Sequence, residues 1–286
     1  MQHGPAVRRR KLGAELRTLR TRAGLTSGEA ARLVGWHQSK VSRIETGTSG
    51  SKPADVRLLL DAYGVADPHL RELMLALASA EGSGGRDHWW HAYRGVLPPA
   101  YRDFISLESQ ASALRTLETT VVPGLLQTPE YARAVTRAAV EGIDEAQLDT
   151  LVAVRMARQD VLRGRPPLEL CAVLDEAVLR REVGGPEVMA RQLDRLVEAA
   201  RLPQVRLQVL PFAAGAHIGM TGPFVIFSFS RDSDLDVVVL DHLMSSLHLE
   251  RKEDLQAYTE AFNALRAQAL SPGDSSEYIA ALAGGA

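Results

Sequence analysis

Apolar residues recur at helical spacing through the first eighty or so residues of the chain, and glycines or prolines interrupt the pattern at short intervals. Leucines three and four positions apart predict a helix over about residues 8–23. Two more apolar segments begin at Pro53 and Pro68, and proline favours the first turn of a helix. Together with two helical segments between them, the pattern predicts a bundle of five short helices.

Residues 25–47, LTSGEAARLVGWHQSKVSRIETG, contain the most informative pattern. Thr26 followed by Glu29 predicts a capping box at the start of a short helix, and Gly35 predicts the tight turn after it. The apolar residues of this helix that we expect to pack inside the bundle are Ala30, Ala31, Leu33 and Val34.

A further helix is predicted over about residues 38–46, with Val41 and Ile44 on its buried side. Its other side is polar and consists of Gln38, Ser39, Ser42 and Arg43. Two short helices joined by a glycine turn, the second beginning in long polar side chains, are typical of a helix-turn-helix that presents side chains to the major groove of DNA.

The chemistry of the polar side suits DNA. Glutamine can bond adenine through two hydrogen bonds, arginine can bond guanine, and serine and lysine reach phosphates or base edges. A helical bundle whose polar side is only solvated would show the same pattern, so that alternative stays open here. The residues that we expect to contact DNA are Ser27, His37, Gln38, Ser39, Lys40, Ser42, Arg43 and Lys52.

Charge is unevenly distributed along the chain. Residues 1–65 carry 12 Lys and Arg against five Asp and Glu, a formal balance of +7, whereas the remainder balances at −9. A basic module on an acidic body is expected of a DNA-binding protein. The basic run at residues 8–11 fits contact with phosphates or a minor-groove arm, and it fits a solvated basic tail about as well.

The segment SKVSRIETG closely resembles the end of the recognition helix in the Xre/Cro/cI-like helix-turn-helix family, where Ser-x-x-Ser-Arg-x-Glu-x-Gly recurs. The resemblance implies that Glu45 is structural and bonds within the bundle, while the polar side approaches bases and backbone. Trp36 and His37 occupy the turn, where relatives more often carry Val, Ser or Thr. Because one recognition helix buries too little surface for tight and selective binding, we expect a homodimer on a double-stranded DNA operator.

Length and composition bound the remaining possibilities. The 286 residues allow two domains of ordinary size, and 45% hydrophobic and 24% charged residues are typical of a globular chain. We find no apolar run of membrane-spanning length and no signal-peptide pattern, and the single Cys171 excludes an intramolecular disulfide. We therefore expect a cytoplasmic protein, associated with the nucleoid when it is bound to DNA, and no membrane partner.

The Gly-rich segment EGSGGRD, residues 81–87, is the best linker in the chain. It separates an expected DNA-binding domain over residues 1–80 from a larger domain over residues 88–286. The larger domain mixes helical segments, including one expected over 105–119, with strand-like ones, which predicts a mainly helical chain whose second domain is α+β. The expected strands are PLELCAVL, QVRLQVLPF (half-exposed), GPFVIFSFS and LDVVVLDHL.

Several segments of the larger domain resemble, in order, one known unit: the C-terminal domain of many actinobacterial regulators, catalogued as domain of unknown function 5753. The similarity covers about residues 88–270 and includes HWWHAYRGVLPPAYRDFISLESQA, VVPGLLQTPEYARAV and QVLPFAAGAHIGMTGPFVIFSF. It implies a transcriptional regulator that is often paired with a small acidic protein encoded beside it. The chain departs from the pattern at VVVLDHLMSS, where Asp241 and His242 stand in place of a Tyr or Val followed by Glu.

Two places in the larger domain are candidates for binding. His88 and His91 have a spacing that could face a metal ion, but no cysteine or matching acidic pair accompanies them, so we expect no metal site. The loop over residues 215–222, interpreted as a long hairpin loop, is our first choice for a ligand or partner contact. The residues assigned to a partner or effector are Trp89, Trp90, Tyr93 and His217.

Motifs of common enzymes are missing from the sequence: there is no Walker motif, no GxGxxG, no GxSxG and no HExxH. Asp175 and Glu176 lie where a strand leads into a helix, a position that favours acids because of the helix dipole. We expect no catalytic residues, no cofactor and no enzymatic activity.

Three hypotheses remain. The first is a DNA-binding regulator whose second domain senses a partner protein, which predicts an exposed apolar patch, for example around Trp89, Trp90, Tyr93 and Tyr101. The second keeps the DNA reader and gives the second domain a small-molecule pocket, which predicts a mostly apolar cavity with a few polar groups. The third is an enzyme fused to a DNA-binding module, which requires a cluster of titratable side chains in one cleft.

Overall fold

The computed structural model describes residues 5–79, 93, 95–229, 236–242 and 245–284. The chain divides into two units, Met1–His88 and Trp89–Ala286. The expected linker over residues 81–87 lies outside the described residues. No helix within the described ranges is both long enough and apolar enough to cross a membrane.

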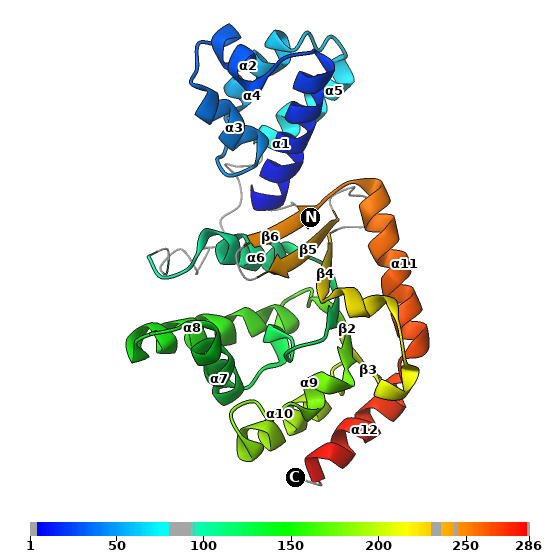
Figure 1. The fold of residues 1–286 in the computed structure, drawn as a ribbon. Helices are drawn as coiled ribbons and strands as arrows, with labels where there is room; N and C mark the ends of the chain where they lie inside the picture. The colour runs from blue at the N-terminus through cyan, green and yellow to red at the C-terminus, as the bar shows by residue number, and fades with distance from the viewer. Residues whose placement is uncertain (1–4, 80–92, 94, 230–235, 243–244, 285–286) are drawn as a thin grey trace. The chain divides into compact units, whose positions relative to one another are not determined.

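The first unit is the expected bundle of five helices (Figure 1). Its core consists of leucines, small alanines and single aromatic or branched residues contributed by all five helices. The helices are α1 (Pro5–Arg22), α2 (Ser27–Leu33), α3 (Gln38–Glu45), α4 (Pro53–Ala62) and α5 (Pro68–Ser79).

The helix-turn-helix forms as the sequence predicts, with one exception. The hydroxyl of Thr26 accepts a hydrogen bond from the backbone of Glu29, whose carboxylate accepts one from the backbone of Thr26, so the capping box is confirmed. Gly35 has φ +69°, which favours glycine in the turn between α2 and α3. The prediction that Leu33 is buried is wrong, because 62% of this residue is exposed. Leu33 lies roughly 100° around α2 from the stripe formed by its other apolar residues.

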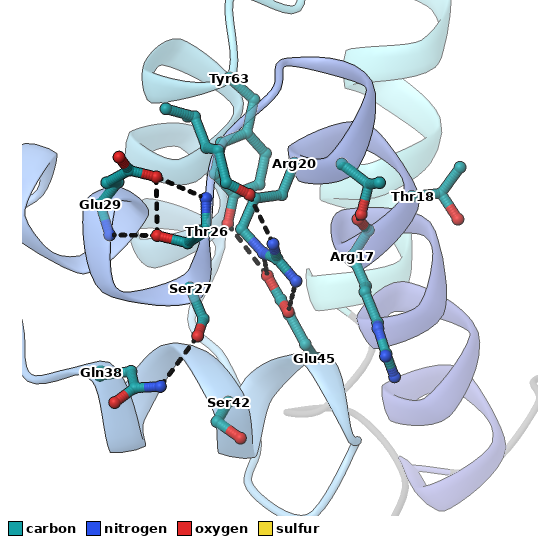
Figure 2. Close-up of polar contacts among 12 residues, drawn as sticks. Arg17, Thr18, Arg20, Thr26, Ser27, Glu29, Gln38, Ser42, Glu45 and Tyr63 are labelled. Carbon is teal, nitrogen blue, oxygen red and sulfur yellow. Dashed lines mark hydrogen bonds and ion pairs between the residues drawn. The ribbon is translucent and has the colours of Figure 1, made fainter.

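A buried ion pair ties α1 to the end of α3. Nε and Nη2 of Arg20 donate to the two carboxylate oxygens of Glu45 at 2.7 and 2.9 Å, and Nη1 donates to the carbonyl oxygen of Leu25 at 2.6 Å. The hydroxyl of Tyr63, just after α4, donates to Glu45 at 3.3 Å (Figure 2). Burial, together with the charge of Glu45, raises the pKa of Tyr63, so its hydroxyl stays protonated and able to donate. The expected structural role of Glu45 is confirmed.

The α1 backbone also approaches the end of α3 closely. A Cβ atom at Gly13 would lie 2.7 Å from the carbonyl oxygen of Glu45, closer than real Cβ contacts. The ion pair and the missing side chain at Gly13 therefore fix the same end of α3 against α1.

The second unit contains a six-stranded mixed sheet in the order β3-β2-β1-β4-β5-β6. The first three of these strands in the sheet are parallel, and β4, β5 and β6 are antiparallel to their neighbours. The expected α+β class is thus confirmed. The strands are β1 (Ala113–Glu118), β2 (Glu169–Asp175), β3 (Val205–Leu210), β4 (Phe224–Ser228), β5 (Val237–His242) and β6 (Ser245–Leu249).

Helices cover both faces of this sheet. Ile226 and Val238 pack with Phe262 of α11 on one face, whereas Phe227 contacts the ring of Phe104 of α6 at 5.2 Å on the other. Figure 1 shows α11 along the opposite side of the sheet from α7 and α8. The helices are α6 (Pro99–Gln110), α7 (Pro129–Ala139), α8 (Glu145–Arg158), α9 (Glu176–Arg180), α10 (Pro186–Ala199), α11 (Lys252–Gln268) and α12 (Pro272–Gly284).

The structure corrects three predictions for this unit. The helix expected over 105–119 ends at Gln110, and the following residues form β1. The strand β3 is not half-exposed: Gln208, which gave the alternating pattern, is buried and donates to carbonyl oxygens at the end of α11 and just beyond it. The segment 215–222 is not a hairpin loop, because β3 and β4 are separated by β2 and β1 in the sheet.

We expect Glu45→Ala to destabilise the first unit by about 3 kcal/mol, because it leaves the partly buried Arg20 guanidinium without its carboxylate partner. Chemical denaturation followed by circular dichroism measures this loss. Glu72→Ala, which removes an exposed glutamate from α5, is the matched control. A loss no larger in Glu45→Ala than in Glu72→Ala would show that the ion pair does not hold the bundle together.

Candidate functional site

The polar side of α3 is free of the bundle core. Val41 and Ile44 are buried, as expected, and the polar residues on the remaining surface of the helix are exposed. His37 occupies the N-cap position without a side-chain capping bond. The exposed polar face of α3, as we use the term below, consists of His37, Gln38, Ser39, Ser42 and Arg43.

A hydrogen bond between the two helices of the motif orients Gln38. Its Nε2 donates to Oγ of Ser27 at 3.0 Å, which joins the first residue of α3 to the first residue of α2 (Figure 2). A glutamine amide has two N–H donors and one carbonyl acceptor, so one donor and the acceptor stay available to a further partner. That pair of groups is the set that the major-groove edge of adenine requires.

Arg43 lies one helical turn after Ser39, and its Nε donates to the carbonyl oxygen of Ser39 at 3.2 Å. This bond directs the exposed side chain back along the outer surface of α3, over Ser39. A guanidinium in this position still has N–H groups for an outside acceptor.

Lys40 does not belong to the exposed polar face. Its Nζ pairs with Asp55 of α4 at 3.1 Å and lies 3.5 Å from the centre of the Trp36 ring. Trp36 packs against the core of the bundle, so the unusual residue in the turn supports a lysine that joins α3 to α4. The expected DNA contact from Lys40 would require this ion pair to open. Lys52 is exposed at the N-cap position of α4 and therefore does not belong to α3, which carries Gln38 and Arg43.

The basic run at residues 8–11 is part of a helix. Helix α1 begins at Pro5, so the run forms its early turns and not an extended arm. Arg9 and Arg10 are partly buried. The structure therefore shows a helix at these positions and not an extended minor-groove arm.

The aromatic candidates of the second unit are mostly outside the described residues. His88, Trp89, Trp90 and His91 all lie there, and their interpretation stays a prediction. Tyr93 is partly buried and packs with Leu97, Ile105 and Val154. In the part of the chain that the structure describes, no group of three or more His, Cys, Asp or Glu side chains could hold a metal ion.

His217 lies in the wall of a cavity of about 330 Å³ that also includes Asp175 and Thr119. Only 8% of its side chain is exposed, and its Nε2 is 3.8 Å from a carboxylate oxygen of Asp175. The same aspartate caps α9 by accepting from the backbone of Ala177 at 2.8 Å, which confirms its expected role as a cap. Near His217 the chain exposes three large apolar side chains, Phe212, Ile218 and Met220.

A second cavity, of about 310 Å³, was not foreseen from the sequence. It lies on the sheet face covered by α6 and α8, and segment 120–127 contributes to its wall. Its wall combines apolar side chains, for example Phe104, Val122 and Val225, with several polar ones. The titratable side chains of the wall are Tyr101, Glu118, Arg155, Arg158 and Asp241.

One arginine of this cavity is fully paired. Nε and Nη2 of Arg158 donate to the two oxygens of Glu108 at 2.8 Å each, and Nη1 donates to the Tyr101 hydroxyl at 2.7 Å. Burial opposes the charge of Arg158, but Glu108 outweighs burial and raises its pKa. Burial would likewise raise the pKa of Tyr101, but Arg158 and Arg155 outweigh it and lower that pKa.

Glu118, the last residue of β1, forms no ion pair with any described residue. Burial is the main cause that raises its pKa to about 8; the charge of Asp241 contributes to the rise, whereas the hydrogen bond from Thr116 and the charge of Arg158 oppose it. Because β1 and β5 are both antiparallel to β4, they run in one direction, and their acidic ends lie at the same edge of the sheet. The cavity thus contains a carboxyl group that is largely protonated at neutral pH.

Comparison with known proteins gives two family matches. The family model described as "Domain of unknown function (DUF5753)" matches residues 101–281, and the one described as "Helix-turn-helix domain" matches residues 11–74. Searches of curated proteins and of solved structures gave no match. The second match includes the whole exposed polar face of α3, and the first includes both cavities.

We expect Glu118→Gln to remove a pH dependence of stability. The folded state holds the Glu118 proton up to a pH of about 8, whereas the unfolded chain releases it near 4.5, so the free energy of unfolding falls as the pH rises between these values. Glutamine keeps the shape of the protonated group and does not ionise. The variant should match the wild type near pH 4 and exceed it at pH 9 by about 2 kcal/mol, allowing for partial exposure.

Urea denaturation at several pH values measures this difference, with the exposed Glu141→Gln as control. Parallel stability curves for Glu118→Gln and the wild type would show that Glu118 ionises normally in the folded protein.

Proposed function

Because this chain belongs to the DUF5753 family and carries a helix-turn-helix domain ahead of the DUF5753 region, we propose that it is a sequence-specific DNA-binding transcriptional regulator of the Xre type. The observation that carries the proposal is the exposed polar face of α3, which the buried Glu45 ion pair holds outward from the bundle. The proposal assigns no catalytic step to the second unit.

In this proposal α3 enters the major groove of DNA. Gln38, oriented by Ser27, reads adenine with its remaining donor and acceptor, and Arg43 reads guanine. Ser39 and Ser42 are short hydroxyl side chains that reach phosphates or base edges. The formal balance of +7 over residues 1–65 supplies the attraction that does not depend on sequence.

A homodimer completes the proposed reader. The exposed polar face of α3 is only two helical turns long, so one copy contacts a few base pairs. Two copies on half-sites about 34 Å apart, one turn of DNA, would double the contacts and make the operator selective.

The proposed role of the second unit is to tune DNA binding through a small acidic partner protein. The exposed apolar side chains Phe212, Ile218 and Met220 support this role, because exposed apolar surface commonly marks a protein contact. Ile218 and Met220 lie in the loop over residues 215–222 that the sequence already favours for such a contact, and Phe212 shortly precedes it.

A second candidate keeps the DNA reader and gives the second unit a small-molecule effector. The cavity between the sheet and α6 and α8 favours it, because its wall combines apolar side chains with several polar ones around one space.

The DNA-binding proposal is tested with a duplex enriched from a random library by in vitro selection and with a scrambled duplex of the same composition. We expect Gln38→Ala and Arg43→Ala each to cost about 1–3 kcal/mol of discrimination between the duplexes. Ser27→Ala should lose part of the Gln38 effect, because the amide is then free to rotate. Fluorescence anisotropy across a salt series measures each affinity.

Arg163→Ala, an exposed arginine of the second unit, controls for the loss of one positive charge. Selection that enriches no sequence, or discrimination unchanged in both α3 variants, would reject the exposed polar face of α3 as the reading surface.

The partner proposal predicts a small acidic protein encoded beside this chain, and co-expression of the two proteins tests it. We expect the pair to co-purify, and Phe212→Asp or Met220→Asp to weaken recovery of the partner at least tenfold, since either change places a charge in the apolar contact. Leu247→Asp, at an exposed leucine on β6, is the matched control. Equal recovery with all three variants would exclude the loop around His217 as the contact.

A further inference from the structure

The cavity on the sheet face contains one arginine without a described carboxylate partner. Nη1 of Arg155 donates to the side-chain oxygen of Gln127 at 3.1 Å, and its Nε is buried with no hydrogen-bond partner among the residues that the structure describes. Its neighbour Arg158 is neutralised by Glu108 through two bonds. The wall therefore includes one guanidinium that has no carboxylate partner among the described residues.

The carboxyl group of Glu118 does not compensate for Arg155. The hydroxyl of Thr116 lies 3.1 Å from the carbonyl oxygen of Phe224 and 3.2 Å from Oε1 of Glu118. The contact with Thr116 lowers the pKa of Glu118, but burial outweighs it, so the carboxyl is largely protonated at neutral pH. Arg155 is therefore left as the charge to be matched.

The size and the wall of the cavity limit what could match that charge. A volume of about 310 Å³ corresponds to roughly ten water molecules at about 30 Å³ each, and hence to a molecule of about ten non-hydrogen atoms. Phe104, Val122 and Val225 would face the body of such a molecule. Asp241, whose carboxylate accepts from the hydroxyl of Ser246 at 2.5 Å, adds a negative charge to the wall.

We propose that this cavity binds a small organic monocarboxylate, with the carboxylate of the ligand on the guanidinium of Arg155 and its apolar body against Phe104, Val122 and Val225. A planar guanidinium matches a carboxylate through parallel N–H bonds. One guanidinium without a described carboxylate partner, in a wall that also contains Asp241, favours a monoanion over a phosphate with two charges. The claim that this ligand is the effector of a DNA-binding regulator rests on the second candidate function above. The claim that the ligand binds to the cavity does not.

Thermal denaturation of the full chain without DNA tests the binding. The probes are acetate, butyrate, hexanoate and phenylacetate, each compared at millimolar concentration with its amide. We expect the acids to raise the melting temperature more than their amides, with an effect that grows with the apolar body until the cavity is filled. The proposal is overturned if no acid of the series stabilises the protein more than its amide does.

Arg155→Met keeps the apolar stem of the side chain and removes the charge. We expect the affinity for the best acid to fall about 10- to 100-fold in this variant, the cost of losing a hydrogen bond to a charged group. Arg191→Met, at an exposed arginine of α10, is the matched control. Undiminished affinity in a folded Arg155→Met protein would overturn the assignment of the carboxylate to Arg155.

Glu118→Gln gives a readout that holds even if Arg155→Met does not fold. In the wild type the affinity for the acid should fall as the pH rises through about 8, because Glu118 then ionises and repels the ligand. Glutamine should abolish this fall. The other charged or titratable groups near Glu118 are Tyr101, Tyr131, Arg155, Arg158 and Asp241. An identical fall in Glu118→Gln would place the ligand away from Glu118 and overturn the proposal.

The link to DNA is measured separately, by anisotropy of the selected duplex with and without the best acid. A change of DNA affinity in the wild type but not in Arg155→Met supports an effector. Acid binding without any change of DNA affinity overturns the effector role and leaves the binding site intact. Failure of the duplex selection affects the proposed DNA reader and not the thermal measurement.

Discussion

The buried pair of Arg20 and Glu45 is the interaction on which the helix-turn-helix depends. Helix α3 is eight residues long and contributes only Val41 and Ile44 to the apolar core, which is little for a helix that must hold its polar face outward. Glu45 adds a bidentate contact to α1 and a hydrogen bond from Tyr63 beyond α4. Because the desolvated carboxylate is bound from two directions, α3 cannot rotate without leaving charges unpaired. The orientation of Gln38 and Arg43 follows from that constraint.

A similar pair organises the second unit with a different result. Arg158 and Glu108 join α8 to α6 through two buried bonds, which fixes α8 over the sheet. Arg155, one turn earlier on α8, lies in the wall of the same cavity and has no carboxylate partner among the described residues. The pairing of Arg158 with Glu108 thus both positions α8 and leaves Arg155 as the group that would bind the charge of the proposed ligand.

The sequence was sufficient for the first unit because its signals are local. The capping box at Thr26, the glycine at position 35 and the apolar spacing of α3 each act within a few residues, and each is found in the structure. Lys40 was assigned to DNA because its spacing cannot reveal that Asp55, fifteen residues away, would bind it. The same holds for Trp36, whose role as the platform under Lys40 appears only when α3 and the turn are in place.

The second unit was harder to predict because its decisive contacts join distant segments. The strand β1, ALRTLE, is built largely of residues that favour helices, and it is a strand because β2 and β4 pair with it on both sides. Once β1 was missed, Glu118 could not be placed at the end of a strand or beside Asp241. The cavity brings together α6, β1, α8 and β5, and no short motif marks such a set. The arginines three apart in VRMAR are the available signal, but their spacing does not show which of them an acid neutralises.

These arrangements constrain how an effector could act. A ligand changes DNA affinity only if it binds more tightly to one conformation of the protein than to another. The proposed ligand would contact both α8 and the sheet. It would therefore favour conformations in which the distance between α8 and the sheet suits its size. By linkage, operator DNA must then change the affinity for the acid by the same factor as the acid changes the affinity for DNA. A partner protein on the loop around His217 would act on the same sheet from the segment that joins β3 to β4. The two candidate signals therefore differ in the surface that they occupy and not in the element that they would move.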